Sequence, residues 1–190
     1  MVVIANLVGM FNFFYCEFLP VFANNKVEMR GRMDERVKLT RSRTALFWSI
    51  TFPGFGQFYN QQFIKGAFFI FLEFLVNLQG EVNRAIIYSF HGEFSLASEV
   101  ANWNWLLFYP CIYIFGAAES YYQAHLKENQ SFAGARFIPF ILAAMVGTIG
   151  TIYGLRWGLG PIFNGLIGMG VGAIIGRIAM SWIDTDIDTD

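Results

Sequence analysis

The sequence predicts an all-α integral membrane protein, a helical bundle with four to five hydrophobic segments, one of them short or re-entrant. Charged residues make up only 14% of the 190, against roughly 25% in soluble domains, which is too few to cover a water-facing surface. Apolar residues make up 55%. They fall in continuous runs that lack the polar face of a soluble helix. Lipid or protein must therefore surround these runs on all sides.

Residues 1–32 are apolar but lack the basic n-region of a signal peptide. They are an anchor or first span, a removed leader, or, if Met33 is the true start, residues added by an over-long gene prediction, and the sequence leaves these alternatives open. Seven of the thirteen basic residues lie between Lys26 and Arg43, so the positive-inside rule places this segment in the cytoplasm. Residues 33–190 are expected to form a single membrane domain.

Residues 44–79 are expected to form a helical hairpin. Its first arm, 44–59, is shorter than the ~20 apolar residues that a span needs, and Pro53 and nearby glycines break it. This arm either crosses the membrane or re-enters on the side from which it came. Re-entry places more of the basic residues on the cytoplasmic side, so the positive-inside rule slightly favours it.

The remainder of the domain predicts an interfacial segment, three spans and a tail. The interfacial segment, 81–101, has apolar residues at near-helical spacing, interrupted at Gly92. The spans are expected at 103–123, where tryptophan and tyrosine lie at both ends as in an aromatic belt, and at 137–155 and 158–182. The acidic tail, 183–190, is expected to be solvated and disordered.

Small residues form a glycine-zipper pattern in the last two spans. They recur at multiples of four in the last span, at Gly160, Gly168, Gly172 and Gly176, and Ala143 and Gly147 give the preceding span a matching face. In lipid, such faces let two helix backbones approach closely. We interpret the pattern as a hairpin within one chain, with homo-oligomerisation through this face and a glycine-lined pore as alternatives.

Two carboxylates lie inside predicted spans. Glu73 shares a helical face with Asn77, and Glu119 shares one with Gln123 on the next span. A carboxylate in hydrocarbon is costly and suggests a functional site, but a protonated carboxyl group that hydrogen-bonds a neighbouring helix explains it equally well. These four residues are the candidate intramembrane polar site, and the sequence does not show whether the two carboxylates meet.

The sequence contains no catalytic, phosphate-binding or dinucleotide-binding motif. Cys16 and Cys111 lie in apolar surroundings and are expected to be buried, small apolar residues. His91 and His125 are isolated from other metal ligands. We therefore expect a non-enzymatic protein with no metal and no cofactor. The net charge of −1 and its uneven layout argue against nucleic acid as a partner and leave the lipid bilayer as the expected one.

The densest motif is PGFGQFYNQQFIKGAFFIF, from Pro53 to Phe71. It resembles the P-G-x-G-Q-x-Y-N-x-Q-x-x-K-G signature found near the N-terminus of many bacterial binding-protein-dependent sugar permeases and in small bacterial membrane proteins related to the two-transmembrane-helix domain family. The matching residues are Pro53, Gly54, Gly56, Gln57, Tyr59, Asn60, Gln62, Lys65 and Gly66. The resemblance implies a shared element by which the chain enters a bacterial cytoplasmic membrane.

A second segment, 112–124, is similar to the Y-x-x-D-A-Y ending of the second conserved span in those small proteins, with Glu119 in place of aspartate. The resemblance does not imply sugar transport, since the chain lacks the E-A-A-x-x-x-G coupling loop and the roughly six spans of a permease. The sequence therefore predicts a multi-pass accessory or scaffold subunit that packs with itself or with a larger, transport-related membrane complex. The alternative is a small transporter or channel that uses Glu73 and Glu119, and an intramembrane enzyme is a weaker third hypothesis.

Overall fold

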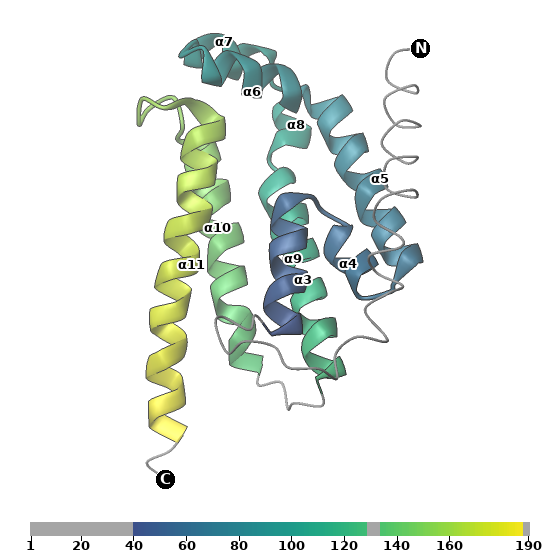
Figure 1. The fold of residues 1–190 in the computed structure, drawn as a ribbon. Helices are drawn as coiled ribbons and strands as arrows, with labels where there is room; N and C mark the ends of the chain where they lie inside the picture. Colours follow the sequence, from purple (N-terminus) through teal and green to yellow (C-terminus); the bar gives the residue numbers. More distant parts are fainter. Residues whose placement is uncertain (1–39, 129–133, 188–190) are drawn as a thin grey trace, which may run out of the picture. The chain divides into compact units, whose positions relative to one another are not determined.

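The computed structural model describes residues 40–128 and 134–187, with side chains through Ile183. Helices make up most of these two ranges, which contain no strand, so the all-α prediction is confirmed. The predicted anchor or leader at 1–32 lies outside the described residues, and so does Cys16. Figure 1 shows the helices α3 to α11 in order along the chain.

The first arm of the predicted hairpin is two helices with a sharp break between them. Helix α3 spans Arg41–Thr51 and α4 spans Phe55–Tyr59. Phe52 is extended, with φ −157° and ψ 127°, because a following proline disfavours the helical conformation. Gly54 then adopts a left-handed φ of 101°, which glycine reaches without steric cost. Neither helix alone could cross a hydrocarbon core about 30 Å thick.

Three segments are long and apolar enough to cross a membrane: Phe63–Gly80, Gly134–Ile152 and Gly160–Ile183. The first is α5, the second joins the 3₁₀ helix η2 (Gly134–Phe137) to α10 (Ile138–Ile152), and the third lies in α11 (Gly160–Ile187). They identify a membrane protein. Helix α9, Tyr109–Lys127, is as long but more polar and is not among them. By length and composition alone, the described residues therefore contain three candidate spans, fewer than the four to five hydrophobic segments predicted.

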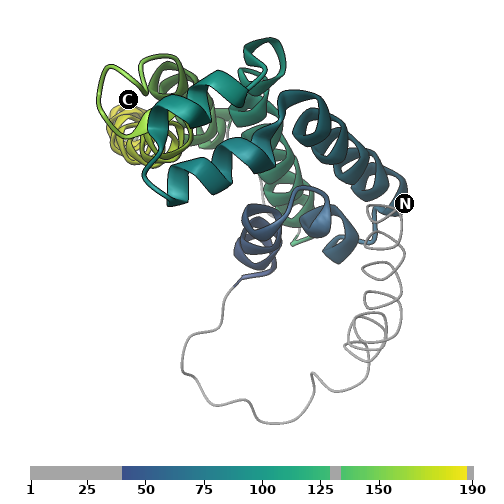
Figure 2. The ribbon, with the colours of Figure 1, turned by 90° about the horizontal axis from the view of Figure 1, so that it is seen from above.

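Three short helices connect α5 to α9 at one end of the bundle. Helix α6 spans Val82–Phe90, α7 spans Phe94–Val100 and α8 spans Trp103–Leu106. Gly92, with φ 78°, lies in the turn between α6 and α7, where the sequence predicts an interruption. The buried core of this region is Val82, Ala85, Ala97, Ala101 and Leu106. Seen from above in Figure 2, α6 and α7 lie across the bundle, and α11 is viewed end-on.

The long helices α5, α9, α10 and α11 run antiparallel in sequence order. Lys65 and Glu73 of α5 contact Glu119 and Tyr109 of α9, respectively. On its other side α9 meets α10 through the pairs Cys111 with Thr148 and Tyr121 with Phe140. In both pairings the residue number rises on one helix as it falls on the other. Helix α9 therefore returns along the bundle between two apolar helices that run in the opposite direction.

Two sequence predictions are wrong in this part of the chain. Helix α11 continues to Ile187, into the tail expected to be disordered, because no glycine or proline after Gly176 interrupts its backbone hydrogen bonds. Cys111, expected to be buried, is exposed. It lies at the margin of the contact between α9 and α10, with its Sγ 3.8 Å from Thr148 Oγ1, where a small apolar side chain can also meet lipid.

Candidate functional site

A buried amide anchors the motif that begins at Pro53 to α9. The side chain of Gln57 on α4 is completely buried. Its Nε2 donates hydrogen bonds to the Gly116 carbonyl oxygen at 2.8 Å and to Glu119 Oε2 at 2.9 Å. A bond to a charged acceptor is stronger than one between neutral groups. The motif around Gln57 and the segment around Glu119, two separate features of the sequence, therefore form one structural unit.

Further buried hydrogen bonds extend this unit to α3. Asn60 Nδ2 donates to the Ser120 carbonyl oxygen at 2.8 Å. The Ser49 hydroxyl donates to the Ser120 hydroxyl at 2.7 Å, and all three side chains are buried. The donors of these buried groups are paired, whereas the amide oxygens of Gln57 and Asn60 have no hydrogen-bond partner within the described residues. We call the set Ser49, Gln57, Asn60, Glu119 and Ser120 the polar lock.

Glycines in the motif let the backbones come close enough for the polar lock to form. A Cβ at Gly54 would lie 2.6 Å from the Gly66 carbonyl oxygen, and one at Gly56 would lie 2.7 Å from Ser120 Cβ. A Cβ at Gly66 would lie 3.0 Å from the Gly54 carbonyl oxygen. Real Cβ atoms do not come closer than about 3.0 Å to atoms that must keep their place. Gly54 and Gly56 therefore need glycine because of packing, and Gly54 needs it because of its φ as well, whereas a Cβ at Gly66 would require its neighbours to shift by a few tenths of an ångström.

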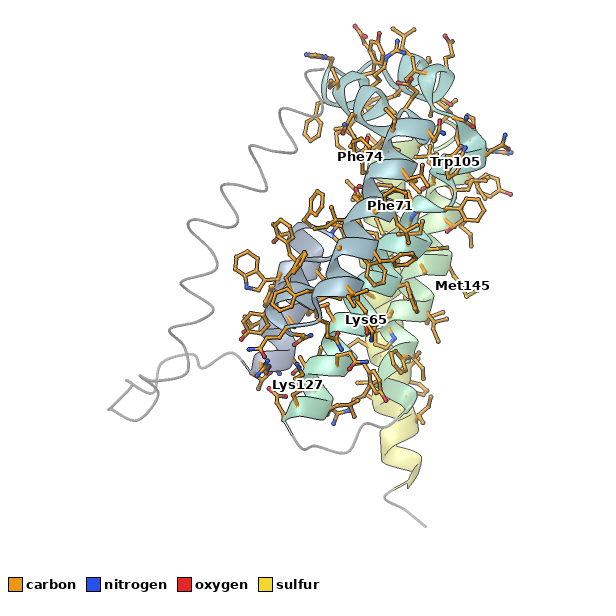
Figure 3. The ribbon with its side chains drawn as sticks, turned by 90° about the vertical axis from the view of Figure 1, so that its right-hand side faces the viewer. Lys65, Phe71, Phe74, Trp105, Lys127 and Met145 are labelled. Atoms are coloured by element: carbon orange, nitrogen blue, oxygen red, sulfur yellow. The ribbon has the colours of Figure 1, made fainter. Side chains whose placement is uncertain are left out.

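Lys65 forms an ion pair with Glu119 across α5 and α9. The lysine side chain is 48% exposed and the glutamate 13% exposed, so the pair lies at the edge of the polar lock. The Lys65 ammonium group therefore has a partner within the protein. Figure 3 shows Lys65 and Lys127 toward the same end of the bundle, and Trp105 toward the other.

Both ends of the α3–α4 segment meet the same end of α9. At its start, the backbone N–H of Ser42 donates to Glu128 Oε1 at 3.2 Å. At its finish, the Asn60 carbonyl oxygen accepts a hydrogen bond from the Lys127 ammonium group. Because Lys127 and Glu128 are adjacent, residues 42 and 60 lie at one level. The segment between them therefore enters the bundle and turns back toward the end where it begins.

The second carboxylate lies apart from the first. Glu73 is buried, and Tyr109 donates its hydroxyl hydrogen bond to Glu73 Oε1 at 2.8 Å. Tyr109 and Glu119 are ten residues apart on α9, about 15 Å at 1.5 Å per residue. Asn77 accepts a hydrogen bond from the backbone of Asn83 near the end of α5. The structure therefore does not bring Glu73, Asn77, Glu119 and Gln123 into one site.

The predicted small faces of the last two long helices meet within the chain. A Cβ at Gly168 would lie 2.5 Å from the Val146 carbonyl oxygen. One at Gly172 would lie 2.8 Å from Ala143 Cα, and one at Gly176 would lie 2.9 Å from the backbone nitrogen of Pro139. The neighbouring helix thus fills the space that a side chain would need. These three positions leave no room for a second copy of the chain.

Sequence reasoning missed several members of this contact. The missing Cβ of Gly165 would lie 2.5 Å from Thr151 Oγ1, and that of Gly150 would lie 2.9 Å from the Asn164 carbonyl carbon. The Asn164 amide is buried and donates to the carbonyl oxygens of Gly154 and Gly160 at 2.9 and 3.1 Å. Gly160 itself faces Phe94 of α7. Gly150 on α10 and Gly154, in the turn just after α10, also have the four-residue spacing, which was the signal available.

His125, expected to be isolated, is buried at the end of α9 beside Arg136 and Glu128. Within the described part of the chain, no group of three or more His, Cys, Asp and Glu residues is arranged to hold a metal ion. Comparison of the chain with protein-family models, with curated proteins and with solved structures found no match. The contacts described above are therefore the basis for assigning a function.

Proposed function

We propose that the protein is a non-enzymatic, multi-pass scaffold or accessory subunit of a membrane complex in the bacterial cytoplasmic membrane. The observation that carries this proposal is that both intramembrane carboxylates are engaged in packing. Gln57 and Lys65 hold Glu119, and Tyr109 holds Glu73. A conduit would need these groups to face a shared path and to exchange protons or ions along it. The ~15 Å between their levels on α9 argues against such a path.

We further propose that α5, α9, α10 and α11 each cross the membrane and that α3 and α4 form a re-entrant pair. If α5 and α10 both cross, α9 must cross as well, because it is antiparallel to both. Two of its polar side chains, Glu119 and Ser120, have partners within the bundle in the polar lock, which lowers the cost of placing them in a membrane interior. Lys65, Lys127 and Arg136 then lie at the end where α3 begins. That end is cytoplasmic by the positive-inside rule.

The motif has a structural role in this proposal. Its glycines and amides fasten the re-entrant pair to α9, so the element by which the chain enters the membrane is also the core of the scaffold. We infer that the small bacterial proteins with the same motif, related to the two-transmembrane-helix domain family, use it in the same way. Large apolar side chains exposed along α5, among them Phe63, Phe68 and Phe71, offer a surface to lipid or to a partner helix.

Neutralising the two carboxylates tests the proposal against a conduit. Proteoliposomes containing the wild type, Glu73→Gln or Glu119→Gln would be assayed for proton and cation flux, with empty liposomes as the baseline. A scaffold predicts no flux above that baseline for any of the three, with Glu73→Gln keeping the Tyr109 bond and near-normal stability. Wild-type flux that either substitution abolishes would overturn the proposal.

Labelling of single cysteines tests the topology separately. In a chain with Cys16 and Cys111 replaced by alanine, cysteine would be placed at the exposed positions Arg43, Gln61 or Glu93. A membrane-impermeant maleimide should label positions 43 and 61 from the same side and position 93 from the opposite side. Labelling of 43 and 61 from opposite sides would mean that α3 and α4 together cross the membrane.

A further inference from the structure

A groove of about 1260 Å³ runs between α3 and the α10–α11 pair, with α9 between them and α6 at one end. Among the described residues that line it, the charged ones are Arg43, Arg136 and Arg177, and none is acidic. We call this cavity the arginine groove. Figure 1 shows α3 and α9 beside α10 and α11, the helices that form its walls.

The three arginines lie at one end of the arginine groove, although they come from different elements. Arg177 follows Gly176, which packs on Pro139, three residues after Arg136. The Arg136 guanidinium lies 3.1 Å from His125 Nε2. His125 is one turn before Glu128, which accepts the hydrogen bond from the residue preceding Arg43. These contacts place the three arginines at the end of the bundle where Lys65 and Lys127 also lie.

Away from the arginines the lining is mostly apolar, with Leu46, Ile86, Pro161, Leu166 and Met169 among its residues, although three tyrosines and Thr151 also contribute. The stretch of α11 from Pro161 to Arg177 is about 24 Å long at 1.5 Å per residue. One leaflet contributes about 15 Å of hydrocarbon. The rim is open to the surroundings, since Phe47, Ile50 and Ile174 are each about half exposed or more. A chain molecule from the bilayer could therefore enter sideways and lie along the groove.

We propose that the arginine groove binds an anionic phospholipid of the cytoplasmic leaflet, with its phosphate at Arg43, Arg136 and Arg177 and its acyl chains along the apolar lining. Guanidinium groups match phosphate oxygens with paired, charge-assisted hydrogen bonds. Basic pockets between membrane helices on the cytoplasmic side suit anionic headgroups. The three positive charges favour a headgroup with net negative charge over a zwitterionic one, whose own cation would face the arginines.

Lipid retention by the full-length protein in detergent, measured by native mass spectrometry, tests the headgroup end. Phosphatidylglycerol and phosphatidylcholine with identical acyl chains are the two probes. The wild type should retain phosphatidylglycerol about tenfold better, and the double variant Arg43→Gln/Arg177→Gln should lose that preference, since each basic side chain adds to anionic binding. The control pair Arg84→Gln/Arg156→Gln, at the opposite end of the bundle, should keep it.

A second variant tests the apolar part without disturbing the fold. Gly170 lines the groove, and a Cβ there would meet no atom within 4 Å. Gly170→Leu should therefore fill the groove and weaken retention of both lipids, whereas Val171→Leu, at an exposed neighbour outside the lining, should not.

Equal retention of the two lipids by the wild type would overturn the proposal, as would an equal loss of preference in both arginine pairs. Unchanged retention in Gly170→Leu would show that the lipids bind elsewhere. If the wild type retains neither lipid, another part of the chain or a second copy fills the groove, and the proposal is wrong.

Discussion

The α10–α11 hairpin and the polar lock bring helices together by opposite means. In the hairpin, glycines remove side chains so that two backbones touch, as Gly168 and Gly172 show. In the polar lock, buried side chains such as Gln57 and Ser49 reach across to α9 and bond to it. Both solve the problem that apolar burial does not hold helices together in lipid. They should therefore fail in different ways when altered.

The hairpin depends on shape and the polar lock depends on hydrogen-bond partners. Added side-chain volume should destabilise the hairpin most, because the backbone of the facing helix cannot move aside. Lost donors should harm the polar lock most, because an unpaired polar group away from water is costly. The three substitutions below separate these two dependences, beginning with the largest expected effect.

Gly172→Leu should be the most damaging change. Its Cβ would lie 2.8 Å from Ala143 Cα, so α10 and α11 must separate, at about 3 kcal/mol or more of unfolding free energy. Gly170→Leu is the matched control, since no atom lies within 4 Å of its Cβ, and it should change stability by less than about 0.5 kcal/mol. Reversible unfolding of both variants in detergent measures the difference. Equal stability of the two would remove the close-packing explanation of the glycine spacing.

Gln57→Leu should have an intermediate effect. The substitution roughly keeps the buried volume but removes the donor to Glu119 and Gly116, which should cost about 2 kcal/mol. Gln79→Leu, at an exposed position on α5, makes the same chemical change without losing a buried bond and should be nearly neutral. The same unfolding assay compares them. If Gln57→Leu is as stable as wild type, shape and not hydrogen bonding holds the motif on α9.

Ser49→Ala should have the smallest effect, about 1 kcal/mol. The Ser120 hydroxyl loses the donor at 2.7 Å but still donates to the Ala117 carbonyl oxygen at 3.0 Å. A double-mutant cycle with Ser120→Ala isolates the energy of the hydroxyl pair. A coupling energy near zero would mean that the two serines serve only as small residues, which would make this contact resemble the hairpin.

The sequence was sufficient to predict the hairpin face, because helical spacing alone determines which residues share a face. Gly168, Gly172 and Gly176 follow from a four-residue repeat. That pattern does not determine the partner's register, so Gly150 and Gly165 were missed. The break at Pro53 and Gly54 was also predictable, since proline and glycine act on local backbone geometry.

The pairing of polar residues was beyond the sequence, for a related reason. A pattern within one helix shows its polar face but not the height at which a neighbouring helix meets it. The observed register sets Lys65 against Glu119 and Tyr109 against Glu73, so the two carboxylates lie at different levels. The sequence also could not predict that Ser49 and Ser120 meet, because small hydroxyl residues occur on many helix faces.

The break at Pro53 and Gly54 has an electrostatic consequence. Each helix carries a partial negative charge at its C-terminus and a partial positive charge at its N-terminus. The C-terminus of α3 at Thr51 and the N-terminus of α4 at Phe55 are four residues apart, so the opposite partial charges lie close together and offset each other. The Tyr113 hydroxyl also donates to the Ile50 carbonyl oxygen. In transporters, the N-termini of broken helices point at anionic substrate groups, and their C-terminal ends coordinate cations. Here ends of opposite sign flank the break, so their partial charges partly cancel, and the irregular backbone should attract an ion less than an unopposed helix end would.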